Sequence, residues 1–164
     1  AFTVRRREAA AKKIAPEAVL RALQGDLLNW SIVAAELAET GWPPIGKSPG
    51  FYVMAGAVLR NGIEPADIKD FLRWVADNKS DPERAGAALV AGVGGIKTLG
   101  SAAASHIALS LARSRLKTGD FDAVMALVRA ALSKGGRVED ILKTVEDVLG
   151  SRGTLRELER RLAR

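Results

Sequence analysis

Cysteine is absent from this sequence of 164 residues, and histidine occurs once, as His106. The lack of cysteine excludes disulfides, thiolate metal sites and cysteine nucleophiles. A single histidine cannot build a histidine metal cluster, nor a Ser/His/Asp arrangement with a spare ligand. Because His106 lies in an otherwise apolar helical segment, we predict that it is a packed or interface side chain. We therefore expect no metal site and no cofactor.

Two sequence patterns are similar to a ligand-binding or catalytic site, and neither supports one. Residues 91–98, AGVGGIKT, look like a phosphate-binding loop, but that motif requires glycine where this sequence has Ala91 and Ile96. No strand is predicted before this segment. Paired carboxylates such as Asp67 and Asp70 fall in the first turns or on the exposed faces of predicted helices, which explains them. The sequence thus predicts a protein that is not an enzyme and has no catalytic residue.

Convincing β-strand patterns are also missing, whereas glycine, proline and capping residues divide the chain into segments with helical apolar spacing. We predict an all-α protein with a basic N-terminal helical arm followed by an antiparallel helical bundle. Residues 1–15 form the arm, residues 16–47 a helix and a Pro/Gly connector, and residues 48–164 the bundle with a basic C-terminal helix. This length suits one domain with an arm.

Residues 51–77 and 121–149 follow one pattern of helix, glycine turn, acidic helix start and helix. The shared sequence requirements of helical hairpins account for this likeness without a true repeat. Capping-box spacing predicts two further helix starts, at Ser80 and at Thr154, each with a glutamate three positions later.

One long stretch, residues 85–112, contains only Lys97 and His106 as groups that could carry charge. Its uninterrupted pieces, 85–96 and 99–112, are each shorter than the roughly 20 residues that a membrane-spanning helix needs. We therefore predict a hairpin of two buried helices, whose many Gly, Ala and Ser residues allow close backbone contact. Packing against a partner subunit or against lipid is the alternative.

The net charge of +6 is distributed unevenly along the chain. Residues 1–15 carry five basic and one acidic side chain, residues 152–164 carry five and two, and the remaining 136 residues sum to −1. Basic ends around a neutral middle indicate a polyanionic partner, most often nucleic acid or anionic lipid. The charges at the N-terminus are not followed by the apolar run of a signal peptide.

Basic residues of the N-terminal segment share one face when residues 3–15 are placed on a helix. The residues on this face are Arg5, Arg6, Lys12 and Lys13, with Arg7 at its border. Small Ala9 between them would let the helix backbone approach a polyanion closely. A solvated N-terminal segment is the alternative.

A second basic ridge is predicted on the last helix, where Leu155, Leu158 and Leu162 form an apolar seam. Arginines recur every four positions on another face, and they are Arg156, Arg160 and Arg164. An ordinary exposed helix is the alternative, because Glu157 and Arg161 have the spacing of an i,i+4 ion pair. The two basic faces together supply the predicted DNA-binding residues.

These features favour a structural protein that packages nucleic acid, in which the bundle makes protein contacts and the basic ends bind phosphates. Both ridges consist of Arg and Lys rather than the Asn and Gln that help to read base edges. The sequence contains no recognisable zinc finger, basic zipper or RNA-recognition motif. Binding is therefore expected to be independent of base sequence and steeply dependent on salt, with a slope near −0.9 for each phosphate contact.

A resemblance to a known family lies mainly in residues 46–92. Its features are Ser48, Tyr52, Gly56 and Arg60 in one helix, then residues 63–66, then a loop at 80–82 that opens another helix. Together with the basic N-terminal helix and the Pro/Gly connector, this segment resembles the major coat proteins of filamentous and rod-shaped archaeal viruses. The resemblance implies homo- or heterodimers whose N-terminal helices wrap linear double-stranded DNA, held in the A form, inside a helical virion. It leaves open whether a lipid envelope surrounds the virion.

Two other functions stay open. Residues 51–84 also resemble the helical segment that follows the catalytic domain in some archaeal and bacterial primase-polymerases. That resemblance implies an intracellular, monomeric module of a replication protein that binds single-stranded template. The third hypothesis is a helical bundle that only binds other proteins, and it predicts no salt-dependent binding of DNA.

Overall fold

A computed structural model describes residues 12, 14–38 and 40–163 of the chain. Within these residues it contains helices and no strand, which confirms the predicted all-α class. Residues 1–11 and 13, which make up most of the predicted basic arm, lie outside the described residues. The helices are α2 (Pro16–Leu37), α3 (Pro49–Arg60), α4 (Pro65–Asp77), α5 (Pro82–Val93), α6 (Ile96–Leu99), α7 (Ser101–Arg113), the 3-10 helix η1 (Thr118–Asp120), α8 (Phe121–Ser133), α9 (Val138–Gly150) and α10 (Leu155–Leu162).

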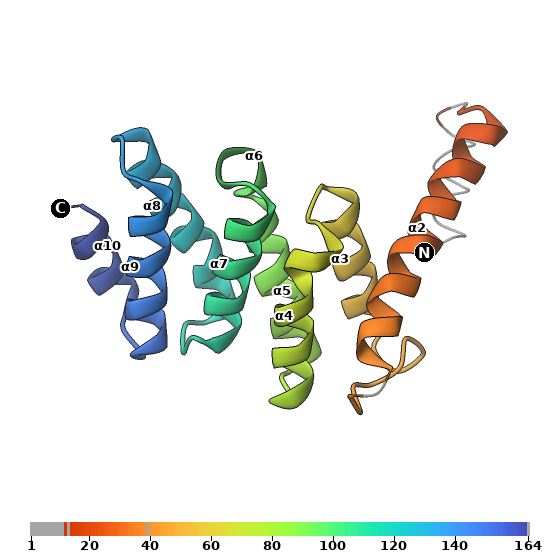
Figure 1. The fold of residues 1–164 in the computed structure, drawn as a ribbon, viewed down its shortest axis with the longest axis horizontal. Coiled ribbons are helices and arrows are strands. Elements are labelled where there is room, and N and C mark those ends of the chain that lie inside the picture. The colour runs from red at the N-terminus through yellow and green to blue at the C-terminus, as the bar shows by residue number, and fades with distance from the viewer. Residues whose placement is uncertain (1–11, 13, 39, 164) are drawn as a thin grey trace.

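The bundle is an elongated array of helical hairpins, with α2 at one end and α10 at the other (Figure 1). One layer contains α2, α4, α7 and α9, each packed against the next, and the other contains α3, α5, α8 and α10 in the same manner. Each helix therefore packs mainly on elements close to it in the chain, as in repeat proteins. One hydrophobic core extends from Val33 of α2 to Leu158 of α10.

The connections between helices lie on two opposite edges of this array (Figure 1). The turns after α2, α4, α7 and α9 are at its lower edge in the view of Figure 1, and the turns after α3, α5 and α8 are at its upper edge. Side chains in turns that are far apart in sequence are thus brought onto a common edge.

The predicted hairpin of Gly-, Ala- and Ser-rich helices is confirmed by the packing of α5 on α7. At Gly92 the two helices approach so closely that an added Cβ would lie 2.7 Å from the carbonyl oxygen of Ala104 and 2.9 Å from Cβ of Ala108. No helix in the described part of the chain is long and apolar enough to cross a membrane.

The two similar segments found in the sequence have matching backbone geometry. Gly62 and Gly135 follow α3 and α8 with φ of 102° and 89°, and Lys79 and Arg152 follow α4 and α9 with φ of 48° and 63°. The same number of positions separates the members of each pair. Each of these helices ends with the hydrogen bonds of a Schellman motif. The likeness therefore extends to equivalent helix ends, beyond the general pattern of a hairpin.

The capping box predicted at Ser80 and Glu83 is wrong, because α5 begins one residue later and Arg84 takes the third helical position. The N-cap of α5 is Asp81 rather than Ser80, and its carboxylate accepts a hydrogen bond of 2.8 Å from the backbone N–H of Arg84. An aspartate directly before a proline suits this position, because proline is tolerated at the first helical residue. At α10 the predicted cap is confirmed, since the hydroxyl of Thr154 accepts from the N–H of Glu157 at 3.2 Å.

An ion pair joins the first two helices at a buried position. Helix α2 continues through Asp26, whose side chain is only 1% exposed and lies 2.7 Å from the guanidinium of Arg60 on α3. Arg60 is 44% exposed, so one charge of the pair is buried and the other is partly hydrated. A buried carboxylate is stable only with compensating partners, so this pair should contribute to the stability of the first hairpin.

We expect Arg60→Met to lower the free energy of unfolding by about 2 kcal/mol, because it removes the cation beside a buried carboxylate. Chemical denaturation followed by circular dichroism would measure the change. In an Asp26→Asn background the same substitution should cost much less, since the carboxylate charge is already gone. Equal costs in the two backgrounds would contradict a stabilising pair.

Candidate nucleic-acid interface

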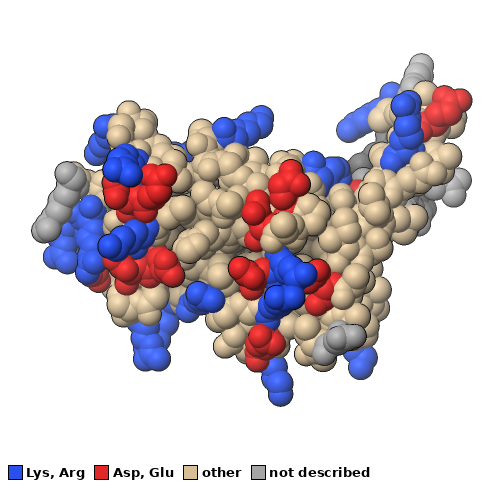
Figure 2. Space-filling model, in the orientation of Figure 1, with Lys and Arg blue, Asp and Glu red and all other residues tan. Residues whose placement is uncertain are grey.

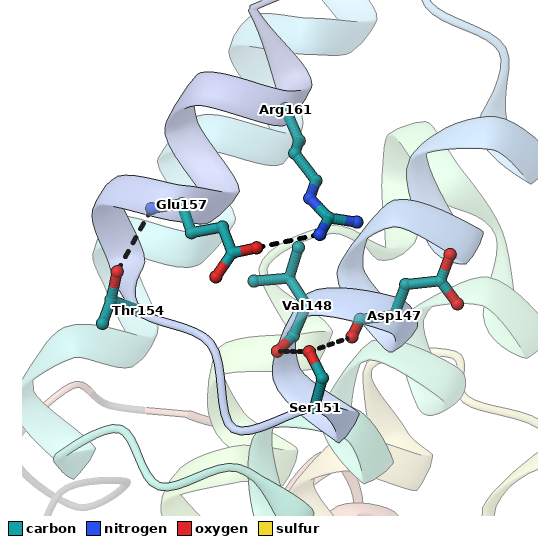
Figure 3. Close-up of polar contacts among 6 residues, drawn as sticks. All are labelled: Asp147, Val148, Ser151, Thr154, Glu157 and Arg161. Atoms are coloured by element: carbon teal, nitrogen blue, oxygen red, sulfur yellow. Dashed lines mark hydrogen bonds and ion pairs between the residues drawn. The ribbon is translucent and has the colours of Figure 1, made fainter.

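The C-terminal helix α10 carries the predicted basic ridge that the structure describes most completely. Leu158 is fully buried, and Leu155 and Leu162 pack against the core, which confirms the predicted apolar seam. Figure 3 shows how the start of this helix is fixed: the hydroxyl of Thr154 caps it, and Ser151 in the preceding turn donates to the carbonyl of Asp147 at 2.6 Å. One face of α10 is therefore held against the core, and the opposite face is exposed to solvent.

Arg156 and Arg160 lie on the solvent-exposed side of α10. Neither forms an ion pair with any residue that the structure describes. Arg161 differs, because its guanidinium is 2.8 Å from the carboxylate of Glu157, the i,i+4 pair expected from the sequence (Figure 3). Two unpaired guanidinium groups thus remain available to bind anions at this end of the array.

The structure places only some of the other predicted contact residues. Lys12 is exposed. The remaining ones lie outside the described residues, and they are Arg5, Arg6, Arg7, Lys13 and Arg164. Helix α2, which follows the N-terminal segment, and α10 are at opposite ends of the array (Figure 1). The structure therefore brings Arg156 and Arg160 together and does not unite them with Lys12 in one site.

A cavity of about 350 Å³ beside α10 is lined by residues of α8, α9 and the glycine turn between them. Its cationic groups are partly neutralised by nearby carboxylates. Arg137 is 3.7 Å from Glu139 and 3.8 Å from Asp140, and Arg161, which also lines the cavity, pairs with Glu157. This arrangement gives the cavity mixed charge rather than a concentrated site for an anion.

Three further titratable groups have structural roles. Nε2 of His106 is 3.3 Å from the carboxylate of Glu146, so this 41% exposed side chain bridges α7 and α9 at the surface of the array. Burial raises the pKa of Tyr52, whose hydroxyl donates to the carbonyl of Pro43 at 3.3 Å. Burial also lowers the pKa of Arg84, and neighbouring Asp81 opposes that shift. Among the described residues no group of three or more side chains could hold a metal ion.

Sequence reasoning did not select four exposed basic residues in the turns that follow α4, α7 and α9: Lys79, Arg115, Lys117 and Arg152. They occur singly or in pairs along the chain. None of them belongs to the basic N-terminal arm or to α10, the two segments that the charge distribution indicated. The signal that could have found them is their recurrence at similar intervals in successive helix-ending turns.

Comparison with protein-family models, curated proteins and solved structures gave no match for this chain.

Proposed function

We propose that this protein binds double-stranded DNA through the phosphate backbone, without reading base sequence, and packages it as a coat subunit of a helical virion. The observation that carries the DNA-binding part is the pair of exposed, unpaired arginines, Arg156 and Arg160, on a helix anchored by its leucine seam. Guanidinium groups on a fixed helix suit phosphate oxygens, since each can donate two parallel hydrogen bonds. The coat function rests on the resemblance in residues 46–92 to the archaeal coat proteins.

The chemistry of the ridge favours binding that is independent of sequence. Arginines spaced one helical turn apart contact a repeating charge, whereas direct reading of bases needs a groove-filling element with mixed hydrogen-bonding side chains. An open array of helices also offers extended surfaces, which suit a long polymer better than a small ligand. We therefore infer contacts to backbone phosphates.

The test is a titration of the full chain with a fluorescent linear duplex at several salt concentrations. Replacing Arg156 and Arg160 with alanine should weaken binding and reduce the magnitude of the salt slope by about 2, because two phosphate contacts are lost. A matched variant with Arg129 and Lys143 replaced by alanine removes the same charge from α8 and α9 and should change the slope less. Equal losses in both variants would show that only net charge matters.

The N-terminal prediction is tested in the same titration. Alanine at Arg5, Arg6, Lys12 and Lys13 should greatly weaken duplex binding while the helical circular dichroism signal stays constant. An unchanged affinity would place the DNA-binding site elsewhere on the molecule.

The coat function has a separate readout. Electron microscopy of the purified protein mixed with linear duplex should show filaments of regular diameter. Dispersed particles that still bind duplex would contradict packaging while leaving DNA binding intact, and a preference for single strands would favour the replication module.

A protein-interaction function is the second candidate, and exposed leucines on α2 favour it. Leu20, Leu27 and Leu28, which are spaced as i, i+7 and i+8 on this helix, are 57%, 53% and 62% exposed. Under this candidate, duplex binding should be absent at every salt concentration, whereas substitution of these leucines by serine should alter association between proteins.

A further inference from the structure

Three turns at the lower edge of the array carry a row of cationic side chains. The turns follow α4, α7 and α9, and we call their four exposed basic residues the basic edge: Lys79, Arg115, Lys117 and Arg152. None of the four forms an ion pair with a described residue. Figure 2 shows Lys and Arg side chains projecting from this edge of the molecule.

The backbone at two of these residues is strained. Lys79 and Arg152 adopt φ of 48° and 63°, a conformation that glycine adopts without steric cost and that a residue with a Cβ adopts at a cost of about 1 kcal/mol. They occupy equivalent positions, each directly after the C-cap of its helix, where glycine is the usual residue. A cationic side chain at both positions, where glycine would be more stable, indicates that the side chain itself has a use.

The third turn is held in place by a side chain from another helix. The guanidinium of Arg84 on α5 donates to the carbonyl of Leu116 at 2.7 Å and to the carbonyl of Ser114 at 2.6 Å. These residues flank Arg115, and Leu116 directly precedes Lys117. The backbone that carries these two cations is thus ordered before any ligand binds, which lowers the entropic cost of binding.

The carboxylates in the same turns accept hydrogen bonds from backbone N–H groups of their own segments. Asp81 accepts the hydrogen bond from the N–H of Arg84, and Asp120 accepts one from the N–H of Lys117 at 3.3 Å. The opposite edge carries both signs of charge around the starts of α4 and α9, with carboxylates at Glu64, Asp67, Glu139 and Asp140 and cations at Lys134 and Arg137. The lower edge is therefore distinguished by the repetition, in three successive turns, of cations without ion-pair partners among the described residues, and not by its net charge.

The residue types in the three turns favour a DNA duplex over a membrane surface or a single strand. Residues 78–81, 114–120 and 151–154 include no aromatic residue and no exposed large hydrophobic side chain. Interfacial helices that bind membranes add apolar side chains that enter the lipid to their electrostatic attraction, and binding of single strands relies on aromatic stacking. Backbone phosphates of a duplex need neither.

We propose that the basic edge is a second duplex-binding surface, on which Lys79, Arg115, Lys117 and Arg152 contact the phosphates of one DNA strand along the array. Helices that pack against each other are about 10 Å apart, so the cations of successive turns are close enough together to contact one duplex at the same time. This inference rests on the proposed DNA-binding function. It adds phosphate contacts along the array to those proposed for the two terminal segments.

The test uses an edge variant of the full chain in which Lys79 and Arg152 become glycine and Arg115 and Lys117 become serine. Glycine relieves the strained φ at both positions, so thermal melting should be unchanged or occur at a higher temperature. In titrations with a fluorescent duplex, we expect affinity to fall about 100-fold and the salt slope to decrease by about 3 to 4, because four phosphate contacts are lost.

The matched control removes four exposed cations from other parts of the array, namely Lys97, Arg129, Lys134 and Lys143, each replaced by alanine. It should lose less than 10-fold in affinity. If the parent chain binds duplex and the edge variant binds as well as this control does, the basic edge is overturned while the proposed function stands.

Two further outcomes overturn the inference. Absence of salt-dependent duplex binding by the parent chain would overturn the proposed function and the basic edge together. Vesicles of phosphatidylserine and phosphatidylcholine should not compete with duplex, and vesicle binding that the edge variant loses would identify the surface as a lipid site instead.

Discussion

Replacing Arg84 with methionine is expected to lower the free energy of unfolding by about 3 kcal/mol. The guanidinium donates to the carbonyl oxygens of Leu111, Ala112, Ser114 and Leu116, and to the hydroxyl of Ser114, at distances from 2.6 to 3.3 Å. It also lies over the ring of Phe121, 5.1 Å from the ring centroid. One side chain of α5 therefore supplies hydrogen-bond donors to the carbonyl oxygens at the end of α7 and in the turn that leads to α8.

The effect should come from the shape of the guanidinium as well as from its charge. Arg84→Lys keeps a cation but cannot supply donors to several carbonyls at once, so it should lose most of the same stability. Arg73 is exposed on the neighbouring helix α4, and Arg73→Met serves as the matched control with a change within about 0.5 kcal/mol. Urea denaturation measures all three variants, and full stability in Arg84→Met would contradict this role.

A second large effect is expected at Gly92, where the substitution to alanine should destabilise the protein by about 2 kcal/mol. An added Cβ would lie 2.7 Å from a backbone oxygen of Ala104, and a backbone atom in a packed helix cannot move aside as a flexible side chain can. Helices α5 and α7 would have to separate, which would loosen contacts at the centre of the array. The measurement is the shift in the urea midpoint at constant m-value.

The control for Gly92 is the same substitution at Gly25, which also lies within a helix. A Cβ at Gly25 would meet no atom within 4 Å, so Gly25→Ala should raise stability by about 0.5 to 1 kcal/mol through helix propensity. The two substitutions are thus expected to have opposite signs. A stabilising effect at both positions would show that α5 and α7 tolerate a wider separation.

Local features of the sequence were sufficient to predict much of the helical structure. Gly62 and Gly135 mark helix ends because their φ values favour glycine, and the leucine spacing of the last helix places Leu158 in the core. The prediction of the α5 N-cap was less accurate, because Ser80 and Asp81 are both good capping residues and only the observed hydrogen bond distinguishes them. Interactions within one helix can be predicted from spacing, whereas competition between adjacent caps depends on the packed backbone.

The candidate binding residues also divide into those that helix spacing predicts and those that only the packed structure brings together. Arg156 and Arg160 could be selected from sequence because residues four positions apart share a helix face. Lys79 and Arg152 could not be selected in that way, since each is isolated among unrelated neighbours, and Arg115 and Lys117 lie in a turn rather than on a helix face. The role of Arg84 was equally hidden, because its partners are carbonyl oxygens of another helix and its turn, which carry no side-chain signal.

The sequence by itself determined the all-α class, the absence of cysteine chemistry and the basic character of both ends, because these depend on composition and on periodicity within single helices. Only the tertiary structure decided that the turns after α4, α7 and α9 share one edge and that α5 and α7 approach closely at Gly92. Those relations depend on how successive hairpins stack, and stacking is governed by shape complementarity between surfaces that are distant in the sequence.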